Sequence, residues 1–302
     1  MMMKAFVLAA GKGERLRPLT DILPKPLAPV LNVPAICYTL TRLRLAGINE
    51  VVINIHHLAD QILGFFKAND NFGFTVHFSH EPLILGTGGG LAQCRSLLSD
   101  SPFLYVNSDT ILDLDLQSII DAFNESGCLG IMAVHPADAG SGRVAVAERR
   151  VKDLRGILGS NRIPSYDFSG VAVLSHEIFK HLRHDFSDIV ETGFISLVQR
   201  GGMCAHIHNA LWHDIGTLES YRRANIERMK NIDDIAPRMR AAIGINPSIA
   251  AESARIDTSA TVISSIIGDG AHIGAGSFVY ESVILPGARV GANERCERRV
   301  VW

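Results

Sequence analysis

The feature that most constrains the fold is the N-terminal stretch, in which an apolar run leads directly into a glycine-rich loop. Residues 5–8, Ala-Phe-Val-Leu, are typical of a buried β-strand. Gly11 and Gly13 follow, and glycines let backbone N–H groups come close to an anion. The same loop carries Arg15 and Lys25 between prolines that stiffen it. The stretch therefore predicts a strand followed by a phosphate-binding loop.

Two common phosphate-binding motifs are excluded at this loop. A dinucleotide-binding fingerprint would need a glycine at position 16, which is Leu16. A Walker A motif would need Gly-Lys-Ser or Gly-Lys-Thr after four spacer residues, and this stretch has neither.

The rest of the first two thirds alternates between strand-like and helix-like segments, which indicates a mostly parallel sheet covered by helices. The expected strands are 4–9, 50–55, 75–79, 103–107, 130–134 and 168–174. The expected helices are 35–45, 59–67, 91–98, 116–124, 194–198 and 217–230, with short alternating strands at 143–154. In such sheets, ligands bind beyond the carboxyl ends of the strands.

The last 50 residues repeat an aliphatic residue every six positions, as at Ile267, Ile273 and Val279. A small residue often lies two places earlier, and glycines mark the corners. Hexapeptide periodicity predicts a parallel β-helix, which we expect to be left-handed with about 18 residues per coil. We expect three segments: an α/β domain at 1–230 that carries the glycine-rich loop, a helical connector at 231–248 interrupted by Pro237, and the β-helix at 249–302.

The N-terminal loop and several downstream motifs together resemble the sugar-1-phosphate nucleotidyltransferases, also called nucleoside-diphosphate-sugar pyrophosphorylases. The resemblance covers about residues 4–225 and implies a Rossmann-like α/β fold. It implies that Leu8, Ala10, Gly11, Gly13, Glu81, Gly86, Thr87 and Gly88 bind the nucleotide, and that Gly142, Ser169 and Gly170 bind the sugar. Arg15 and Lys25 would be catalytic.

Two remote carboxylates are candidates for a metal site. Asp109 follows the apolar strand at 103–107, and Asp214 lies in the segment Trp-His-Asp-Ile-Gly-Thr at 212–217. Opposed carboxylates can hold Mg²⁺ and leave its other positions to phosphates and water. The resemblance implies that Asp109 and Asp214 hold Mg²⁺ jointly. Histidines at 56–57, 80, 206, 208 and 213 are interpreted as structural.

The implied reaction joins a nucleoside triphosphate to a sugar 1-phosphate and releases pyrophosphate. The favoured reading is a mannose-1-phosphate guanylyltransferase. The alternative is a uridylyl- or thymidylyltransferase acting on N-acetylmuramate 1-phosphate or glucose 1-phosphate, and another class is an inactive regulatory subunit that binds nucleotide sugars. The Glu-Lys-Pro triplet whose lysine grips the sugar phosphate in many relatives is missing, as in N-acetylmuramate-1-phosphate uridylyltransferases, and Lys152, Arg155 and Arg162 are possible replacements.

Composition and charge argue against nucleic acid or a membrane as a partner of this chain. A net charge of −2 gives no basic surface for nucleic acid or an anionic membrane, and no apolar run approaches a membrane span. The N-terminus lacks a signal-peptide pattern, and five scattered cysteines are expected to be buried thiols in the cytoplasm. The open end of the β-helix predicts a homo-oligomer.

Overall fold

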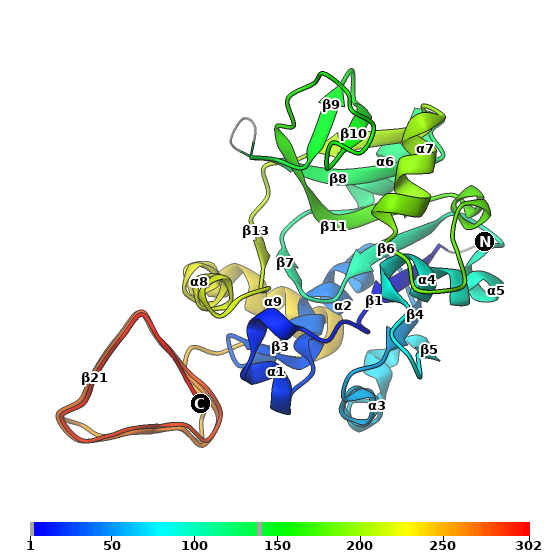
Figure 1. Cartoon of the computed structure of the whole chain (residues 1–302). Coiled ribbons are helices and arrows are strands. Elements are labelled where there is room, and N and C mark those ends of the chain that lie inside the picture. Colours follow the sequence, from blue (N-terminus) through cyan, green and yellow to red (C-terminus); the bar gives the residue numbers. More distant parts are fainter. Residues whose placement is uncertain (1–2, 138–140) are drawn as a thin grey trace. The chain divides into compact units, whose positions relative to one another are not determined.

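The computed structural model describes residues 3–137 and 141–302 and divides into two compact units (Figure 1). The first unit is made of residues 1–12 and 42–212, and the second of residues 13–41 and 213–302. The N-terminal loop therefore contributes to both units. The domain bounds expected at residues 230 and 248 remain a prediction.

The first unit is organised around a nine-stranded mixed sheet in the order β5-β4-β1-β6-β11-β8-β12-β10-β9. The strands are β1 (Lys4–Leu8), β4 (Glu50–Ile55), β5 (Thr75–His80), β6 (Phe103–Asn107), β8 (Gly130–Pro136), β9 (Val144–Ala147), β10 (Arg150–Leu154), β11 (Tyr166–Leu174) and β12 (Met203–Ile207). Strands β5, β4, β1 and β6 are parallel, whereas β11 runs antiparallel to both β6 and β8. The expected strands are all present, and the α/β fold class is confirmed.

Helices cover this sheet and complete its core. They are α3 (Ala59–Ala68), α4 (Gly86–Gln93), α5 (Arg95–Leu98), α6 (Leu116–Ser126) and α7 (Ile195–Gln199), with 3₁₀ helices at Asp70–Gly73 and His176–Lys180 and a π-helix at Val190–Phe194. A short strand, β7 (Thr110–Leu112), follows β6. Alternate strand residues such as Phe6 and Tyr105 join Leu91 of α4 and Phe194 in one buried apolar cluster. Because side chains alternate along a strand, their neighbours point to the opposite face.

The prediction of a single helix over 91–98 is wrong in where the helix starts and in its continuity. Helix α4 begins at Gly86 and includes three consecutive buried glycines, and Cys94 separates it from α5. A Cβ at Gly89 would lie 2.3 Å from the Asp185 carbonyl oxygen, and one at Gly88 would lie 2.8 Å from Ser187 Oγ. Close packing against residues 185–188 therefore compensates for the low helix propensity of glycine.

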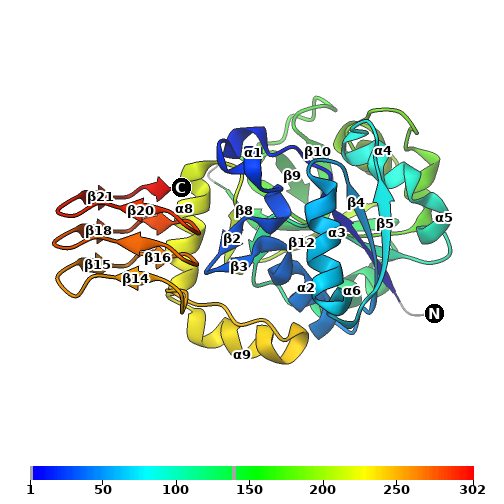
Figure 2. The ribbon, with the colours of Figure 1, turned by 90° about the horizontal axis from the view of Figure 1, so that it is seen from below.

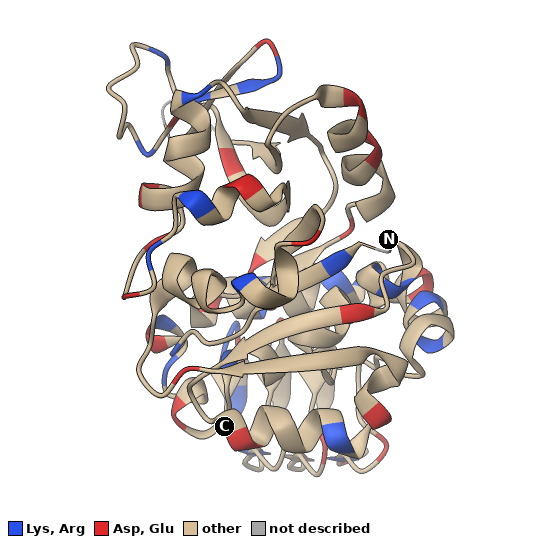
Figure 3. Ribbon diagram, turned by 90° about the vertical axis from the view of Figure 1, so that its right-hand side faces the viewer, with Lys and Arg blue, Asp and Glu red and all other residues tan. Residues whose placement is uncertain are grey.

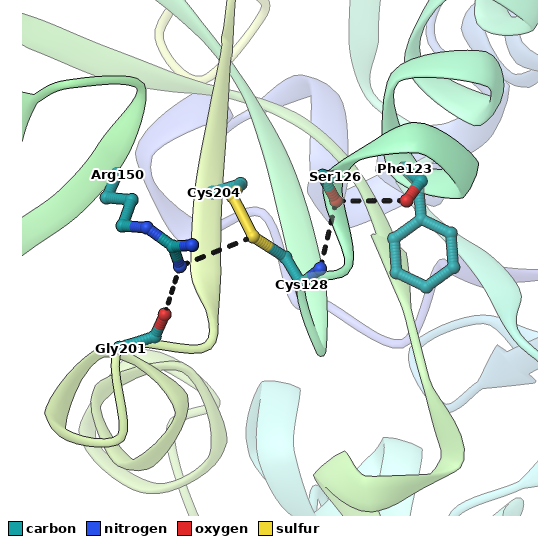
Figure 4. The surroundings of a disulfide bond; sticks show 6 residues. All are labelled: Phe123, Ser126, Cys128, Arg150, Gly201 and Cys204. Atoms are coloured by element: carbon teal, nitrogen blue, oxygen red, sulfur yellow. Dashed lines mark hydrogen bonds between the residues drawn. A yellow bond between two sulfur atoms is a disulfide. The ribbon is translucent and has the colours of Figure 1, made fainter.

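Cysteine pairing also differs from expectation. Cys128, two residues before β8, forms a disulfide with Cys204 of β12, with 6.1 Å between the Cα atoms (Figure 4). Strands β8 and β12 are adjacent and parallel, which brings together residues 76 positions apart in the sequence. The thiols of Cys37, Cys94 and Cys296 are free and buried as expected, and burial raises the pKa of Cys37 to about 12.

The second unit begins with the loop after β1 and continues after β13. Its elements are turns at Glu14–Leu16 and Lys25–Leu27, α1 (Leu19–Ile22), β2 (Pro29–Val30), β3 (Val33–Pro34), α8 (Leu218–Met229) and α9 (Ile232–Ile243), while α2 (Ala35–Leu45) and β13 (Trp212–Asp214) cross between units. Asn225 of α8 accepts a hydrogen bond from the Leu31 N–H at 2.9 Å. Helix α9 continues through Pro237, where an interruption was expected.

The C-terminal tail forms three coils with a triangular outline, which stack on one another (Figures 1 and 2). Its strands are β14 (Arg255–Ile256), β15 (Thr261–Ile263), β16 (Ile266–Ile267), β17 (His272–Ile273), β18 (Phe278–Tyr280), β19 (Val283–Ile284), β20 (Arg289–Val290), β21 (Arg295–Glu297) and β22 (Val300–Val301). They build three parallel sheets, consistent with the short left-handed β-helix that the repeat predicts. Arg255 pairs with His272, so a coil advances by 272 − 255 = 17 residues where about 18 were expected.

The β-helix is tied to the β2–β3 turn within the same unit. Asn32, at the tip of that turn, donates to the carbonyl of Ile267 at 3.0 Å and to that of Ser248 at 3.1 Å. Arg222 of α8 donates to the carbonyl of Glu281 at 3.0 Å. These bonds come from polar side chains outside the repeat, which the six-residue period does not reveal.

Charges of both signs are distributed along the ribbon (Figure 3). Within residues 3–137 and 141–302, no helix has the length and apolarity that crossing a membrane requires.

Candidate active site

The second unit brings together one group of predicted site residues, Gly13, Arg15, Lys25 and Asp214, which we call the loop group. Lys25 Nζ lies 3.4 Å from Asp214 Oδ1, and the Lys25 side chain is only 12% exposed. A Cβ on Gly216 would lie 2.8 Å from Asp214 Oδ2 and 3.1 Å from an Arg15 terminal nitrogen. Two cations and one carboxylate therefore converge within one unit.

Local sequence explains why the loop group is ordered. Gly13 has a φ of 66°, a left-handed conformation that favours glycine, and its carbonyl accepts a hydrogen bond from Thr20 Oγ1 at 2.8 Å. Leu16 is fully buried and anchors the turn that carries Arg15. After Asp214, Thr217 caps α8 by accepting a hydrogen bond from the Ser220 N–H.

The first unit holds the remaining predicted nucleotide-binding residues around the carboxyl end of β1. The Leu8 carbonyl accepts a hydrogen bond from Ser108 Oγ at 2.7 Å, and the Ala9 N–H donates to Asn54 Oδ1 at 2.8 Å. Ala10 is buried and Gly11 is exposed. The strand therefore delivers an exposed glycine directly after its last buried residues.

Glu81 is fully buried and connects three segments of the first unit. Its carboxylate accepts hydrogen bonds from Asn54 Nδ2 at 2.7 Å and from the Leu85 N–H at 2.9 Å. A Cβ on Gly90 would lie 2.5 Å from this carboxylate. Glu81 thus holds the start of α4 beside β4, while Gly86, at φ 71°, and Thr87 pack against residues 187–189. Part of the glycine signal in this loop therefore reflects packing.

The predicted sugar-binding residues lie on and beside β11 in the first unit. Ser169 is buried, and Gly170 has a φ of 79°; a Cβ on Gly170 would lie 2.8 Å from Thr110 Oγ1 and 3.0 Å from Asn107 Nδ2. A Cβ on Gly142 would lie 2.7 Å from the Tyr166 backbone nitrogen, so glycine is needed for that close approach. Asp109 lies half-buried in the turn after β6.

Sequence reasoning missed the polar groups that surround Ser169. His208 Nε2 lies 2.7 Å from Ser169 Oγ and His135 Nδ1 lies 3.2 Å from it, while Trp212 Nε1 donates to the Ser169 carbonyl at 3.2 Å. Burial lowers the pKa of His208 to about 4, with further lowering from nearby His135. The available signal was polar residues at alternating positions in an otherwise apolar strand, Asp167 and Ser169.

The two carboxylates have the chemistry that Mg²⁺ requires. Asp214 is 42% exposed, and Asp109 lies half-buried at a strand end, so each can present hard oxygen ligands. Within the described residues, no cluster of three or more His, Cys, Asp and Glu side chains has the arrangement of a metal site. Each carboxylate by itself offers the hard oxygen ligands that Mg²⁺ prefers.

Comparison with known proteins identifies the family. The sequence profile described as nucleotidyl transferase matches residues 4–148. The chain is 34% identical over 230 residues to an N-acetylmuramate alpha-1-phosphate uridylyltransferase of Neisseria meningitidis serogroup B, an alignment that covers 72% of this chain and 94% of that protein. The chain belongs to the nucleotidyl transferase family. It is a sugar-1-phosphate nucleotidyltransferase, as the resemblance implied.

A further relative aligns with more of this chain, and a solved structure shares its fold. A mannose-1-phosphate guanylyltransferase catalytic subunit beta of Danio rerio is 27% identical over 269 residues, covering 84% of this chain and 72% of that protein. A Bacillus anthracis crystal structure with bound sucrose is 21% identical, covers 74% of this chain and 94% of its own, and superposes with a TM-score of 0.66. The latter likeness shows the nucleotidyltransferase fold.

Proposed function

We propose that this enzyme transfers a uridylyl group from UTP to N-acetylmuramate 1-phosphate. The observation that carries the proposal is the 34% identity to the neisserial uridylyltransferase across 94% of that protein. The missing Glu-Lys-Pro triplet supports the same substrate. We prefer this proposal to mannose-1-phosphate guanylyl transfer because the alignment covers 94% of the neisserial protein, against 72% of the Danio rerio relative.

Mannose-1-phosphate guanylyl transfer is the second candidate. The alignment with the Danio rerio subunit covers 84% of this chain, against 72% for the neisserial protein. The greater coverage supports a shared arrangement of segments along the chain, but it carries no information on the substrate.

In the proposed reaction, an oxygen of the sugar phosphate attacks the α-phosphorus of the nucleotide in line, and pyrophosphate leaves opposite. Such transfers depend on positioning and charge neutralisation. We assign Arg15 to the departing pyrophosphate and Lys25 to the α-phosphate. Amides of the loop at Gly11 and Gly13 cradle the triphosphate.

Asp109 and Asp214 would hold Mg²⁺. A bound ion would supply positive charge to the phosphates. Lys25 Nζ, 3.4 Å from Asp214 Oδ1, offsets the charge of that carboxylate. We propose that Glu81 orders the loop containing Gly86, Thr87 and Gly88 for the base, and that Gly142, Ser169 and Gly170 line the sugar site.

The test is pyrophosphate release with Mg²⁺, measured for UTP, GTP and dTTP against the 1-phosphates of N-acetylmuramate, mannose and glucose. We expect the highest kcat/KM for UTP with N-acetylmuramate 1-phosphate. A preference for GTP with mannose 1-phosphate would favour the second candidate. Release of pyrophosphate with none of the pairs would favour an inactive subunit that binds nucleotide sugars. The presence of all four predicted residues, Arg15, Lys25, Asp109 and Asp214, argues against that outcome.

We also propose that the enzyme acts in the cytoplasm, where nucleoside triphosphates are available, and that it forms a homo-oligomer through the β-helix. Three coils leave strands at both ends of the stack, and such ends are ordinarily covered.

A further inference from the structure

A row of polar side chains lies on one face of the sheet in the first unit. Val134 belongs to the buried apolar cluster and Phe168 packs against it. Their strand neighbours His135, Asp167 and Ser169 therefore point to the opposite face. His135 and Asp167 are direct partners across β8 and β11, so their side chains are adjacent.

A chain of hydrogen bonds orients His135 within this row. The Ala210 N–H donates to His208 Nδ1 at 3.2 Å, so the proton of neutral His208 is on Nε2, which donates to Ser169 Oγ at 2.7 Å. The Ser169 hydroxyl then donates to His135 Nδ1 at 3.2 Å. This arrangement leaves the proton of neutral His135 on Nε2. Its ring stacks on Trp212 with centroids 4.1 Å apart, which fixes its plane.

Arg143 is held at the end of the same row. Its Nε donates to Asp167 Oδ1 at 3.0 Å, and its backbone N–H donates to the Tyr166 carbonyl at 2.9 Å. Asp167 is 19% exposed, whereas the Arg143 side chain is 64% exposed. A guanidinium has five N–H donors, so the terminal nitrogens of Arg143 can still approach a ligand while Nε stays on Asp167.

The row lies beside the end of β6, and Asp109 lies in the turn that follows this strand. Gly170 follows Ser169 and lies against Asn107, the last residue of β6. Adjacent strands are about 4.8 Å apart, so β8 is about 10 Å from β6 with β11 between them. A sugar whose phosphate lies near Asp109 could therefore extend over Ser169 toward His135 and Arg143.

We propose that Arg143, oriented by Asp167, and the Nε2–H of His135 bind a second anionic group on the sugar, the carboxylate of N-acetylmuramate 1-phosphate. This inference rests on the proposed function and adds the residues that select the acidic sugar. A guanidinium matches a carboxylate with its planar pair of donors. N-acetylglucosamine 1-phosphate lacks the carboxylate, so it would gain nothing from Arg143. Arg155, one of the cations considered from the sequence, is paired instead with Asp188 at 3.1 Å.

The test compares kcat/KM for N-acetylmuramate 1-phosphate and N-acetylglucosamine 1-phosphate at saturating UTP. We expect Arg143→Ala to lower kcat/KM about 10- to 100-fold for the acidic sugar, mainly through KM, and to change it less than about threefold for the neutral sugar. His135→Phe keeps a ring against Trp212 and removes the Nε2–H donor. It should lower the ratio of kcat/KM for the acidic sugar to kcat/KM for the neutral sugar about tenfold. Arg143→Lys should recover part of the preference.

Arg298→Ala is the matched control, because Arg298 also pairs with a carboxylate, Glu281, at 3.0 Å and is 66% exposed. We expect Arg298→Ala to leave kcat/KM for both sugars unchanged. Equal losses for both sugars would assign Arg143 to the shared phosphate and overturn the inference, as would an unchanged ratio in Arg143→Ala. These outcomes require an active wild-type enzyme; a wild type without uridylyl transfer to N-acetylmuramate 1-phosphate would overturn the proposed function and this inference together.

Discussion

At the scale of single residues, buried and half-buried polar side chains hold neighbouring segments together by hydrogen bonds. Glu81 is fully buried, yet its carboxylate accepts from a side-chain amide and a backbone N–H. Such a buried acceptor stabilises the fold because the N–H groups that donate to it cannot reach water instead. The same reasoning applies to Ser169 between His135 and His208.

Glu81→Ala is expected to destabilise the protein by about 2–4 kcal/mol, because it leaves Asn54 and the Leu85 N–H without their acceptor. Glu81→Gln keeps one acceptor oxygen and should cost less. Urea denaturation measures both. Equal stability of the wild type and Glu81→Ala would contradict the structural role.

Lys25→Ala is expected to lower kcat by about 10²–10³, as loss of one preorganised charge partner commonly does. Pyrophosphate release under saturating substrates measures it. The control is Lys180→Ala, which removes an exposed lysine that pairs with Glu177 at 2.7 Å and should leave kcat unchanged. Near-normal turnover of Lys25→Ala would remove its catalytic role.

His208 makes stability depend on pH. Its pKa is about 4 in the folded protein because of burial, followed by the charges of His135, His206 and Arg42, against an ordinary value of 6.5. The folded state therefore prefers neutral His208, so its contribution is complete above about pH 6.5 and is lost as the pH falls toward 4. The loss would reach about 3 kcal/mol at the lowest pH.

Chemical unfolding at pH 7.5 and pH 5 measures this dependence. His208→Gln should be less stable at pH 7.5 and should lose less stability on acidification than the wild type. Identical pH dependence in the two proteins would exclude His208 as its source.

At the scale of elements, α4 shows how tertiary packing overrides local preference. Glycine is a poor helix former, yet Gly88, Gly89 and Gly90 are helical because neighbouring segments leave no room for a Cβ. The exposed face of α3, where Gly64 lies, offers the opposite case. At Gly64, no described atom beyond its local neighbours lies within 4 Å of an added Cβ.

Gly89→Ala is expected to destabilise the protein by about 1–3 kcal/mol, since its Cβ would lie 2.3 Å from the Asp185 carbonyl oxygen. Gly64→Ala is the matched control and should stabilise by about 0.5–1 kcal/mol through helix propensity. Thermal unfolding of the two variants measures the contrast. A stabilised Gly89→Ala would show that residues 185–188 do not pack on α4 in solution.

At the scale of the whole molecule, the β-helix is the part that bears on assembly. Its buried interior contains Ile267, Ile273, Val279, Ile284 and Val290, which stack from coil to coil. The first coil leaves apolar side chains exposed: Ile256, which is in register with buried Ile273, is 42% exposed, and Ile263 is 43% exposed. Apolar exposure beside strand edges favours association with another copy of the chain.

Light scattering at micromolar concentration is expected to show a homo-oligomer. Ile263→Asp should shift the population toward monomer, because the carboxylate would be buried without a partner. Arg289→Asp, on an exposed position of β20, controls for added negative charge. A monomeric wild type would contradict the proposal.

Much of the fold was predictable from the sequence because its signals are local. Short apolar runs predict the strands at 50–55 and 103–107 with their observed bounds, and β1 ends one residue before the predicted 4–9. Helices α2 and α6 follow from helical spacing. The repeat in the tail predicts the β-helix for the same reason, because each coil is stabilised by its sequence neighbours. The loop motif likewise pointed to Arg15, Lys25 and the reaction class.

What only the tertiary structure decided depends on contacts between distant segments. The insertion of β11 between β6 and β8 juxtaposes Asp167 with His135, and the pairing of β8 with β12 brings Cys128 to Cys204. Lys25 meets Asp214 across 189 positions of sequence. Local propensity carries no information on strand order, because the burial energy of the whole core selects which segments become neighbours.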